Sequence, residues 1–172
     1  MIQKKIIIQI ALICFCLTTV FGQGTKFIEK KYHFNMLNTK NGLSSDEIND
    51  IVQDAEGFTW IATSNGLNRF NGLDVKVYMH DKKDTASLLQ NSVMSLFVDN
   101  ANDLWISYEG EGLSRYNDDL DYFQHFYPSK KNTGEALEIK DIVQYDSAKL
   151  LLTSYCGPVI FSTVTLKTQD FP

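Results

Sequence analysis

The stretch QDAEGFTWIAT at residues 53–63 decides the fold of this chain, because it recurs. Residues 96–107, LFVDNANDLWIS, place Asp99 and Trp105 forty-five positions after Asp54 and Trp60. The chain contains two tryptophans, and both therefore occupy one position of the repeat. A fixed period of this length is the mark of a repeat architecture.

The repeat continues beyond this stretch. Residues 65–71, NGLNRFN, return as EGLSRYN at 111–117, now 46 positions away, so one residue is inserted in the intervening turn. A third copy emerges at an offset of 91, where Leu151 replaces Trp60 and the Asp and Arg of the motif are lost. We assign these residues to structural positions of the repeat: Asp54, Gly57, Trp60, Gly66, Leu67, Arg69, Asp99, Trp105, Gly112, Leu113 and Arg115.

Each copy contains four short β-type runs separated by turn residues. In the first copy we expect strands at 48–53, 58–63, 67–70 and 75–78. Residues 44–47, SSDE, also form a helix capping box, which favours a short helix there. The second copy has no such cap at its equivalent, residues 91–98, so a strand is favoured. Four strands in about 45 residues, repeated, predict an all-β partial propeller with two clear blades and a degenerate third.

We place the boundaries as follows: signal peptide 1–22, N-terminal segment 23–43, first blade 44–86, second blade 87–134 and degenerate third blade 135–172. Lys4 and Lys5 precede an apolar run at 6–21, the pattern of a secretory signal. The chain is therefore expected in the periplasm or outside the cell. An uncleaved anchor is the alternative, although the run is short for a membrane span.

The composition excludes some classes of function. The formal charge is −5 and no basic cluster exceeds a lysine pair, so nucleic-acid binding by this segment is not expected. No phosphate loop, dinucleotide fingerprint or nucleophile elbow occurs in the sequence. We therefore assign no catalytic residue, no cofactor and no metal site.

The combination of Gly42-Leu43-Ser44 with residues 53–63 and 65–72 resembles the two-component regulator propeller repeat. Residues 99–116 are similar to a second copy, and the resemblance covers about residues 32–128. Members of this family are large bacterial sensors whose periplasmic propellers precede a membrane helix and a histidine kinase. The resemblance implies that this chain is the N-terminal part of a ligand-sensing propeller that responds to glycan-derived molecules.

The implied partners are downstream blades and a kinase region of a longer protein, with an oligosaccharide as ligand. The alternative is a stand-alone secreted binding or scaffold module, or a decayed remnant. Fewer than three complete blades leave two open sides, because repeats bury their faces only against neighbours. We therefore expect the isolated chain to be marginally stable or to self-associate. The run at 32–37 is a candidate for the strand that closes the ring.

Several side chains allow both a binding and a structural interpretation. Trp60 and Trp105 could stack on a sugar, but mid-strand repetition favours packing between blades. Arg69 and Arg115 could hold an anion, but repetition favours bonds to strand-end carbonyls. Cys156 could be a nucleophile, although a small buried apolar side chain is the favoured interpretation.

The remaining polar residues give weak signals. The spacing of Asp99, Ala101 and Asp103 faintly resembles that of a calcium-binding loop. This sequence lacks the glycine and the glutamate that such a loop requires, so a polar turn is expected. The acids in residues 118–121 could be paired carboxylates of a glycosidase, but hairpin acids are usually solvated. His80 and His125 share a repeat position in the last strand without the spacing of a zinc site.

Overall fold

The computed structural model describes residues 35–110, 112–130 and 134–171. The chain divides into two compact units, Met1–Asn35 and Met36–Pro172, and the fold described below is that of the second. The predicted signal peptide lies outside the described residues, as do residues 32–34 of the candidate closing strand. Its described part, residues 35–37, is not a strand. A single turn of 3-10 helix, η1 (Thr39–Asn41), precedes the first sheet.

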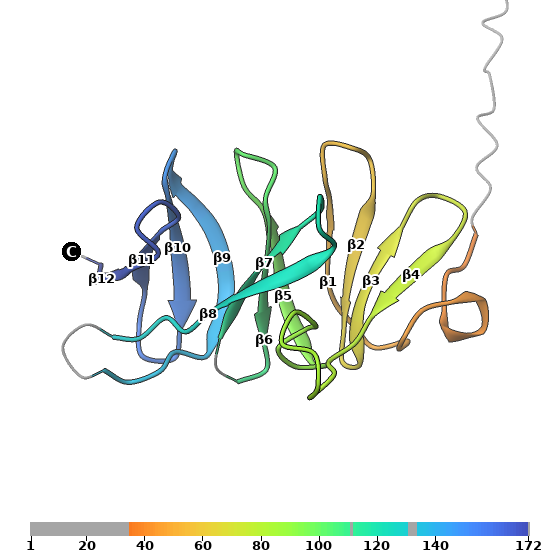
Figure 1. The fold of residues 1–172 in the computed structure, drawn as a ribbon, viewed down its shortest axis with the longest axis horizontal. Coiled ribbons are helices and arrows are strands. Elements are labelled where there is room, and N and C mark those ends of the chain that lie inside the picture. Colours follow the sequence, from red (N-terminus) through yellow and green to blue (C-terminus); the bar gives the residue numbers. More distant parts are fainter. Residues whose placement is uncertain (1–34, 111, 131–133, 172) are drawn as a thin grey trace, which may run out of the picture. The chain divides into compact units, whose positions relative to one another are not determined.

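The described residues form three antiparallel sheets of four strands each, in sequence order (Figure 1). The first sheet contains β1 (Ile48–Gln53), β2 (Thr59–Thr63), β3 (Gly66–Phe70) and β4 (Val75–Tyr78). The second contains β5 (Val93–Val98), β6 (Leu104–Tyr108), β7 (Leu113–Asn117) and β8 (Tyr122–Phe126). The third contains β9 (Ile139–Asp146), β10 (Lys149–Ser154), β11 (Val159–Ser162) and β12 (Thr168–Asp170). The all-β prediction of propeller blades is confirmed.

The register of strand pairing repeats from sheet to sheet. Trp60 on β2 pairs with Val52 and Arg69. In the second blade Trp105 pairs with Phe97 and Arg115 in the same way. In the third blade Leu151 pairs with Val143 and Ile160. The third copy thus forms a complete four-stranded blade although it has lost the tryptophan. The strand at 48–53 is also confirmed over the alternative helix.

The innermost strand of every blade carries a β-bulge at the same position. The register shifts between Ile48 and Asp50, between Val93 and Ser95, and at Ile139–Asp141. A bulge turns the next side chain out of the regular ladder. In the first blade this places Asp50 against the second, where Oδ2 accepts a hydrogen bond from the Leu96 amide at 2.8 Å. The bulge therefore ties neighbouring inner strands together.

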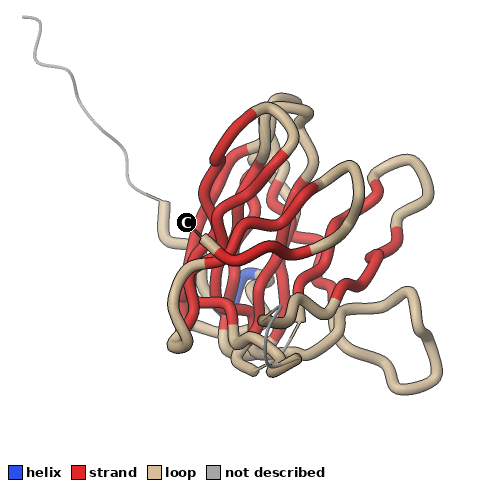
Figure 2. The backbone as a smooth tube through the Cα atoms, turned by 90° about the vertical axis from the view of Figure 1, so that its left-hand side faces the viewer, coloured by secondary structure: helices blue, strands red, loops and turns tan. Residues whose placement is uncertain are grey.

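The blades bury their apolar faces against one another, as the row of sheets in Figure 1 indicates. Trp60 and Ala62 of the first blade pack against Leu104 and Ile106 of the second. The opposite face of the second blade packs Trp105 and Phe126 against the third. Because successive residues of a strand point to opposite faces, each blade contributes to two cores. Figure 2 shows that strands and loops make up nearly all of the described chain.

Cys156 is a correction to the sequence prediction. It is an exposed free cysteine, not a buried apolar residue. It lies in the turn between β10 and β11, one residue before Gly157, which has a φ of 100°. A turn of this kind points its side chains toward solvent. Separately, no helix among the described residues is long and apolar enough to cross a membrane.

Candidate functional site: a polar pocket between the first two blades

A pocket of about 270 Å³ lies where the first blade meets the second. It is bordered by the turns that follow β1, β5 and β7, and its floor includes Trp60 and Arg69 from the middle strands. The strands fix the floor, whereas the turns supply most of the charged groups. Charged side chains on turns above a rigid sheet are a common arrangement for a binding site.

Arg69 is the one cationic side chain, among the described residues, that lines the pocket. Its guanidinium carbon is 3.7 Å from the centroid of the Phe58 ring and 5.1 Å from that of Trp60. A guanidinium over an aromatic face is attracted by the ring quadrupole. Two aromatic rings of its own blade therefore hold the Arg69 side chain in place.

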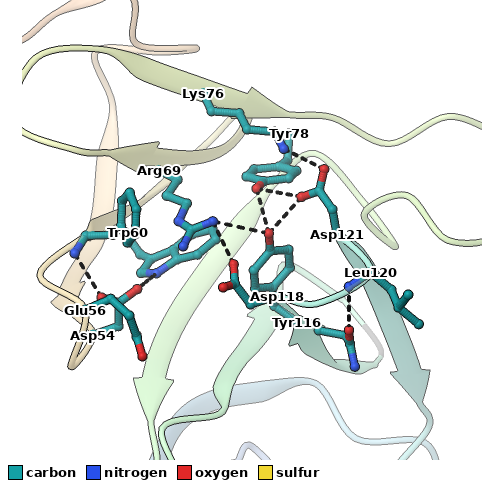
Figure 3. A network of polar contacts seen from close by, with 12 residues as sticks. Asp54, Glu56, Trp60, Arg69, Lys76, Tyr78, Tyr116, Asp118, Leu120 and Asp121 are labelled. Atoms are coloured by element: carbon teal, nitrogen blue, oxygen red, sulfur yellow. Dashed lines mark hydrogen bonds and ion pairs between the residues drawn. The ribbon is translucent and has the colours of Figure 1, made fainter.

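Arg69 reaches across the gap to the second blade. Its Nη1 forms an ion pair with Asp118 at 2.8 Å, and the same nitrogen lies 3.5 Å from the hydroxyl of Tyr116 (Figure 3). The predicted bonds to strand-end carbonyls are therefore wrong for this residue, since its partners are side chains. The Arg69 Nε is buried and has no hydrogen-bond partner among the described residues.

A second cluster extends the contact toward the outer edge of the blades. The hydroxyls of Tyr78 and Tyr116 are 3.0 Å apart, and both donate to Asp121 Oδ1, at 3.0 and 2.7 Å (Figure 3). Lys76 Nζ forms an ion pair with Asp121 Oδ2 at 2.5 Å. Although burial acts in the opposite direction, these three donors hold the pKa of Asp121 below its ordinary value.

The acids of residues 118–121 are all exposed to solvent, as the sequence predicted, and two of them are also paired. Asp118 and Asp121 each bind a cation of the first blade, and these contacts cross the gap between the blades. Asp119 remains exposed and has no hydrogen-bond or ion-pair partner among the described residues. No glycosidase-like pair is needed to explain Asp118 and Asp121, because each has a structural partner.

The two aspartates of the motif brace the tryptophans. Asp54 Oδ2 accepts from Trp60 Nε1 at 2.7 Å, and Asp99 Oδ2 accepts from Trp105 Nε1 at 2.8 Å. Both rings are buried, so neither presents a face for stacking on a sugar. The bond satisfies the one polar atom of each indole inside an apolar core.

Arg115 does not repeat the contacts of Arg69. Its Nη1 pairs with Asp103 at 3.2 Å and its Nη2 donates to the Gln124 side chain at 3.0 Å, both within the second blade. The predicted carbonyl partners are wrong here as well.

The turn at 99–103 that faintly resembled a calcium loop is closed by Asp99, whose Oδ1 accepts hydrogen bonds from the amides of Ala101 and Asp103. No group of three potential metal ligands is assembled in the described part of the chain.

His80 and His125 lie near each other at a smaller pocket beside the loop 79–92. His125 is on β8, whereas His80 follows the end of β4, so only one of them is within a strand. His125 Nδ1 is 2.8 Å from Ser114 Oγ, which accepts from the Tyr108 hydroxyl at 2.8 Å. Burial, with His80 nearby, lowers the pKa of His125.

Sequence reasoning did not find Tyr78, Tyr116 or Lys76 as members of a network. One signal was present, since Tyr116 occupies the repeat position of Phe70 and replaces an apolar ring by one with a hydroxyl. A hydroxyl introduced at a buried position needs a partner. That requirement points toward the neighbouring acids at 118–121.

Comparison with known proteins agrees with this architecture. The family model described as "Two component regulator propeller" matches residues 42–65. Over 82 residues, 48% of this chain, it is 29% identical to a protein named "Histidine kinase P4" from Formosa agariphila. The extracellular domain of the putative hybrid two component system BT3049 from B. thetaiotaomicron is 25% identical, with a TM-score of 0.68 over 82% of this chain.

A second extracellular domain, that of the putative one component system BT4673 from B. thetaiotaomicron, shares the fold with a TM-score of 0.67 at 21% identity, again over 82% of this chain. The chain spans only 6% of the Formosa agariphila protein and about a fifth of each of the two extracellular domains, 20% and 21%. The repeat, its register and these likenesses agree. The described residues therefore form blades of a β-propeller, and residues 42–65 match the repeat of the two component regulator propeller family.

Proposed function

We propose that this segment is the N-terminal part of the ligand-sensing propeller of a two-component signalling protein, located in the periplasm or outside the cell. The observation that carries the proposal is the likeness, over 82% of the chain, to the extracellular domain of a putative hybrid two component system. The pocket between the first two blades supplies a place for a ligand. We further propose a glycan-derived molecule as that ligand, with any kinase activity in another region.

The open faces of the outer blades support a longer propeller or self-association. On β9, Val143 and Tyr145 point away from the second blade and are 38% and 46% exposed. On β1, at the opposite end of the row of blades, Ile51 also points away from the second blade and is 54% exposed. Apolar faces of this kind are normally covered by neighbouring repeats. We propose that further blades, or a second copy of this chain, cover them.

A deletion in the source bacterium tests the sensory role. Codons 44–126, which encode the first two blades, are removed in frame, and transcription is compared after transfer from glucose to each oligosaccharide of a panel. A strain with the same segment recoded by synonymous codons is the matched control. We expect the deletion to abolish the transcriptional response to at least one oligosaccharide. Unchanged responses to the whole panel would contradict the sensory role and favour the stand-alone scaffold.

A further inference from the structure

Residues 79–92 connect β4 of the first blade to β5 of the second. One part of this connection is anchored, since Leu88 is 1% exposed within the core shared by the first two blades. The part before it, residues 81–87, is exposed or half-buried, and we call it the strap. Among the described residues, one hydrogen bond between backbone groups joins the strap to the blade, from the Phe123 amide of β8 to the Ala86 carbonyl at 2.9 Å.

The strap holds its own shape. Asp81 and Asp84 each accept, through Oδ1, a hydrogen bond from the amide two residues further on. Ser87 Oγ closes the loop, because it accepts from the Asp81 amide at 2.9 Å and donates to the Asp84 carbonyl at 2.7 Å. All of these bonds are internal to the strap. It can therefore move as a unit when its contacts with β8 are lost.

His125 of β8 faces the strap. It lines one pocket with Thr85, and the backbone of Thr85 and Ser87 is within hydrogen-bonding range of its ring. Its Nδ1 is 2.8 Å from Ser114 Oγ, and the Tyr108 hydroxyl donates to the same oxygen at 2.8 Å. His125 thus links the strap to the interior of the second blade.

Only one arrangement of hydrogens satisfies this chain of groups. The side chains of Tyr108 and Ser114 are fully buried. If Ser114 donated to Tyr108, the Tyr108 O–H would have no acceptor, because the amide of Leu89, 3.5 Å from that hydroxyl, can only donate. Tyr108 therefore donates to Ser114, and Ser114 donates to Nδ1 of His125. The neutral ring of His125 consequently carries its hydrogen on Nε2.

His80 has the opposite tautomer. Its Nδ1 is 2.7 Å from the Leu88 carbonyl, which can only accept, so Nδ1 carries the hydrogen. A second proton on His80 goes to Nε2, which has no hydrogen-bond partner among the described residues. On His125 the second proton must go to Nδ1, where the Ser114 hydrogen already points. Protonation of His125 therefore leaves the buried Ser114 hydroxyl without an acceptor.

The surroundings of the ring also oppose its charged form. Burial lowers the pKa of His125 and His80 lowers it further, whereas the backbone of Thr85 and Ser87 acts in the opposite direction. The other titratable side chains at this pocket carry charges of both signs or none: Asp81, Lys82, Asp84 and Tyr127. An uncharged His125 and a closed strap therefore favour each other.

We propose that the strap is a pH-operated cover, which lies against β8 while His125 is neutral and opens when His125 takes up a proton. In the open form the ring is solvated and its pKa returns to the ordinary value for histidine. The strap is thus closed above about pH 6.5, and opening increases as the pH falls below that value. Leu88 stays in the core, so the blades remain joined. This inference does not depend on what the segment binds.

Nuclear magnetic resonance of the full chain tests both halves of the inference. At neutral pH, the nitrogen shifts of the imidazole rings should place the hydrogen on Nε2 of His125 and on Nδ1 of His80. Hydrogen exchange of the Phe123 amide reports opening, and the Thr163 amide, which donates to the Ala148 carbonyl at 2.9 Å in the third blade, is the reference. Between neutral pH and about pH 5, protection of Phe123 should fall about threefold or more relative to that of Thr163, since opening takes up a proton.

Variants assign the effect to one side chain. His125→Gln keeps an oxygen that can accept from Ser114 but does not titrate, so the protection of Phe123 should no longer depend on pH. Ser114→Ala removes the hydroxyl that occupies Nδ1 and should weaken the dependence. His80→Gln is the matched control, because it makes the same substitution at the same pocket. It should leave the dependence in place.

Three outcomes overturn the inference. The first is a hydrogen on Nδ1 of His125 at neutral pH. The second is protection of Phe123 that follows that of Thr163 at every pH, which means that the whole fold opens and not the strap. The third is loss of the pH dependence in His80→Gln to the same extent as in His125→Gln.

Discussion

The Asp99 carboxylate accepts three hydrogen bonds within its own blade, and its replacement gives the sharpest test of how a blade is held together. In Asp99→Ala, the amides of Ala101 and Asp103 lose their acceptor and so does Trp105 Nε1. The Ala101 amide is exposed and the Asp103 amide is half-buried, so both can bind water and each loss costs about 0.5 kcal/mol. Trp105 is fully buried, and its orphaned N–H costs about 2 kcal/mol. The free energy of unfolding should fall by about 3 kcal/mol.

Asp99→Asn separates the two contributions. The amide side chain keeps an oxygen for the turn but turns a nitrogen toward Trp105 Nε1, so we expect a loss of about 2 kcal/mol. Urea titration followed by tryptophan fluorescence measures both values, with Asp74→Ala as a control on an exposed turn. If Asp99→Ala costs less than about 1 kcal/mol, or if Asp99→Asn is the more damaging of the two, the aspartate does not brace the tryptophan as described.

Three other measurements test separate parts of the structure. Ser107→Ala should raise the free energy of unfolding by about 1 kcal/mol, since the buried Ser107 Oγ has no partner among the described residues; an unchanged urea midpoint contradicts this. Because the pKa of His125 is lowered by burial with His80 nearby, the unfolded chain binds the proton more readily. Stability should thus be full above about pH 6.5 and fall as the pH decreases below it, and His125→Gln should flatten urea midpoints measured between about pH 5 and 8. Cys156→Ser should remove one fast-reacting thiol from the native chain in a disulfide-exchange assay, whereas an unchanged count would mean that Cys156 is not exposed.

Much of the fold follows from the repeat alone. The 45-residue period aligns Trp60 with Trp105, and the observed register pairs both with equivalent residues on either side. The repeat also predicts that Cys156 is exposed, because an offset of 91 aligns it with Asn65, which lies in a turn. The favoured interpretation of Cys156 relied on the general tendency of cysteine to be buried. Position within the repeat was the better guide.

The pocket could not be predicted in the same way. Arg69 and Asp118 are 49 positions apart, and nothing in the spacing indicates that they meet. Their contact depends on how far one blade turns relative to the next, which is set by the packing of whole faces around Trp60 and Tyr116. Repeat analysis identifies residues that recur. It does not identify pairs of residues, such as Arg69 and Asp118, that meet between only one pair of neighbouring blades.

The contrast between Arg69 and Arg115 shows how one repeat position acquires two roles. In the second blade the arginine finds an acid, Asp103, on the strand turn of its own blade. The equivalent position in the first blade is Phe58, which offers a ring but no carboxylate. Arg69 must therefore find its counter-charge on the next blade, and Asp118 supplies it. A phenylalanine in place of an aspartate thus leaves the guanidinium of the first blade paired with the next blade, whereas the guanidinium of the second blade is paired within its own.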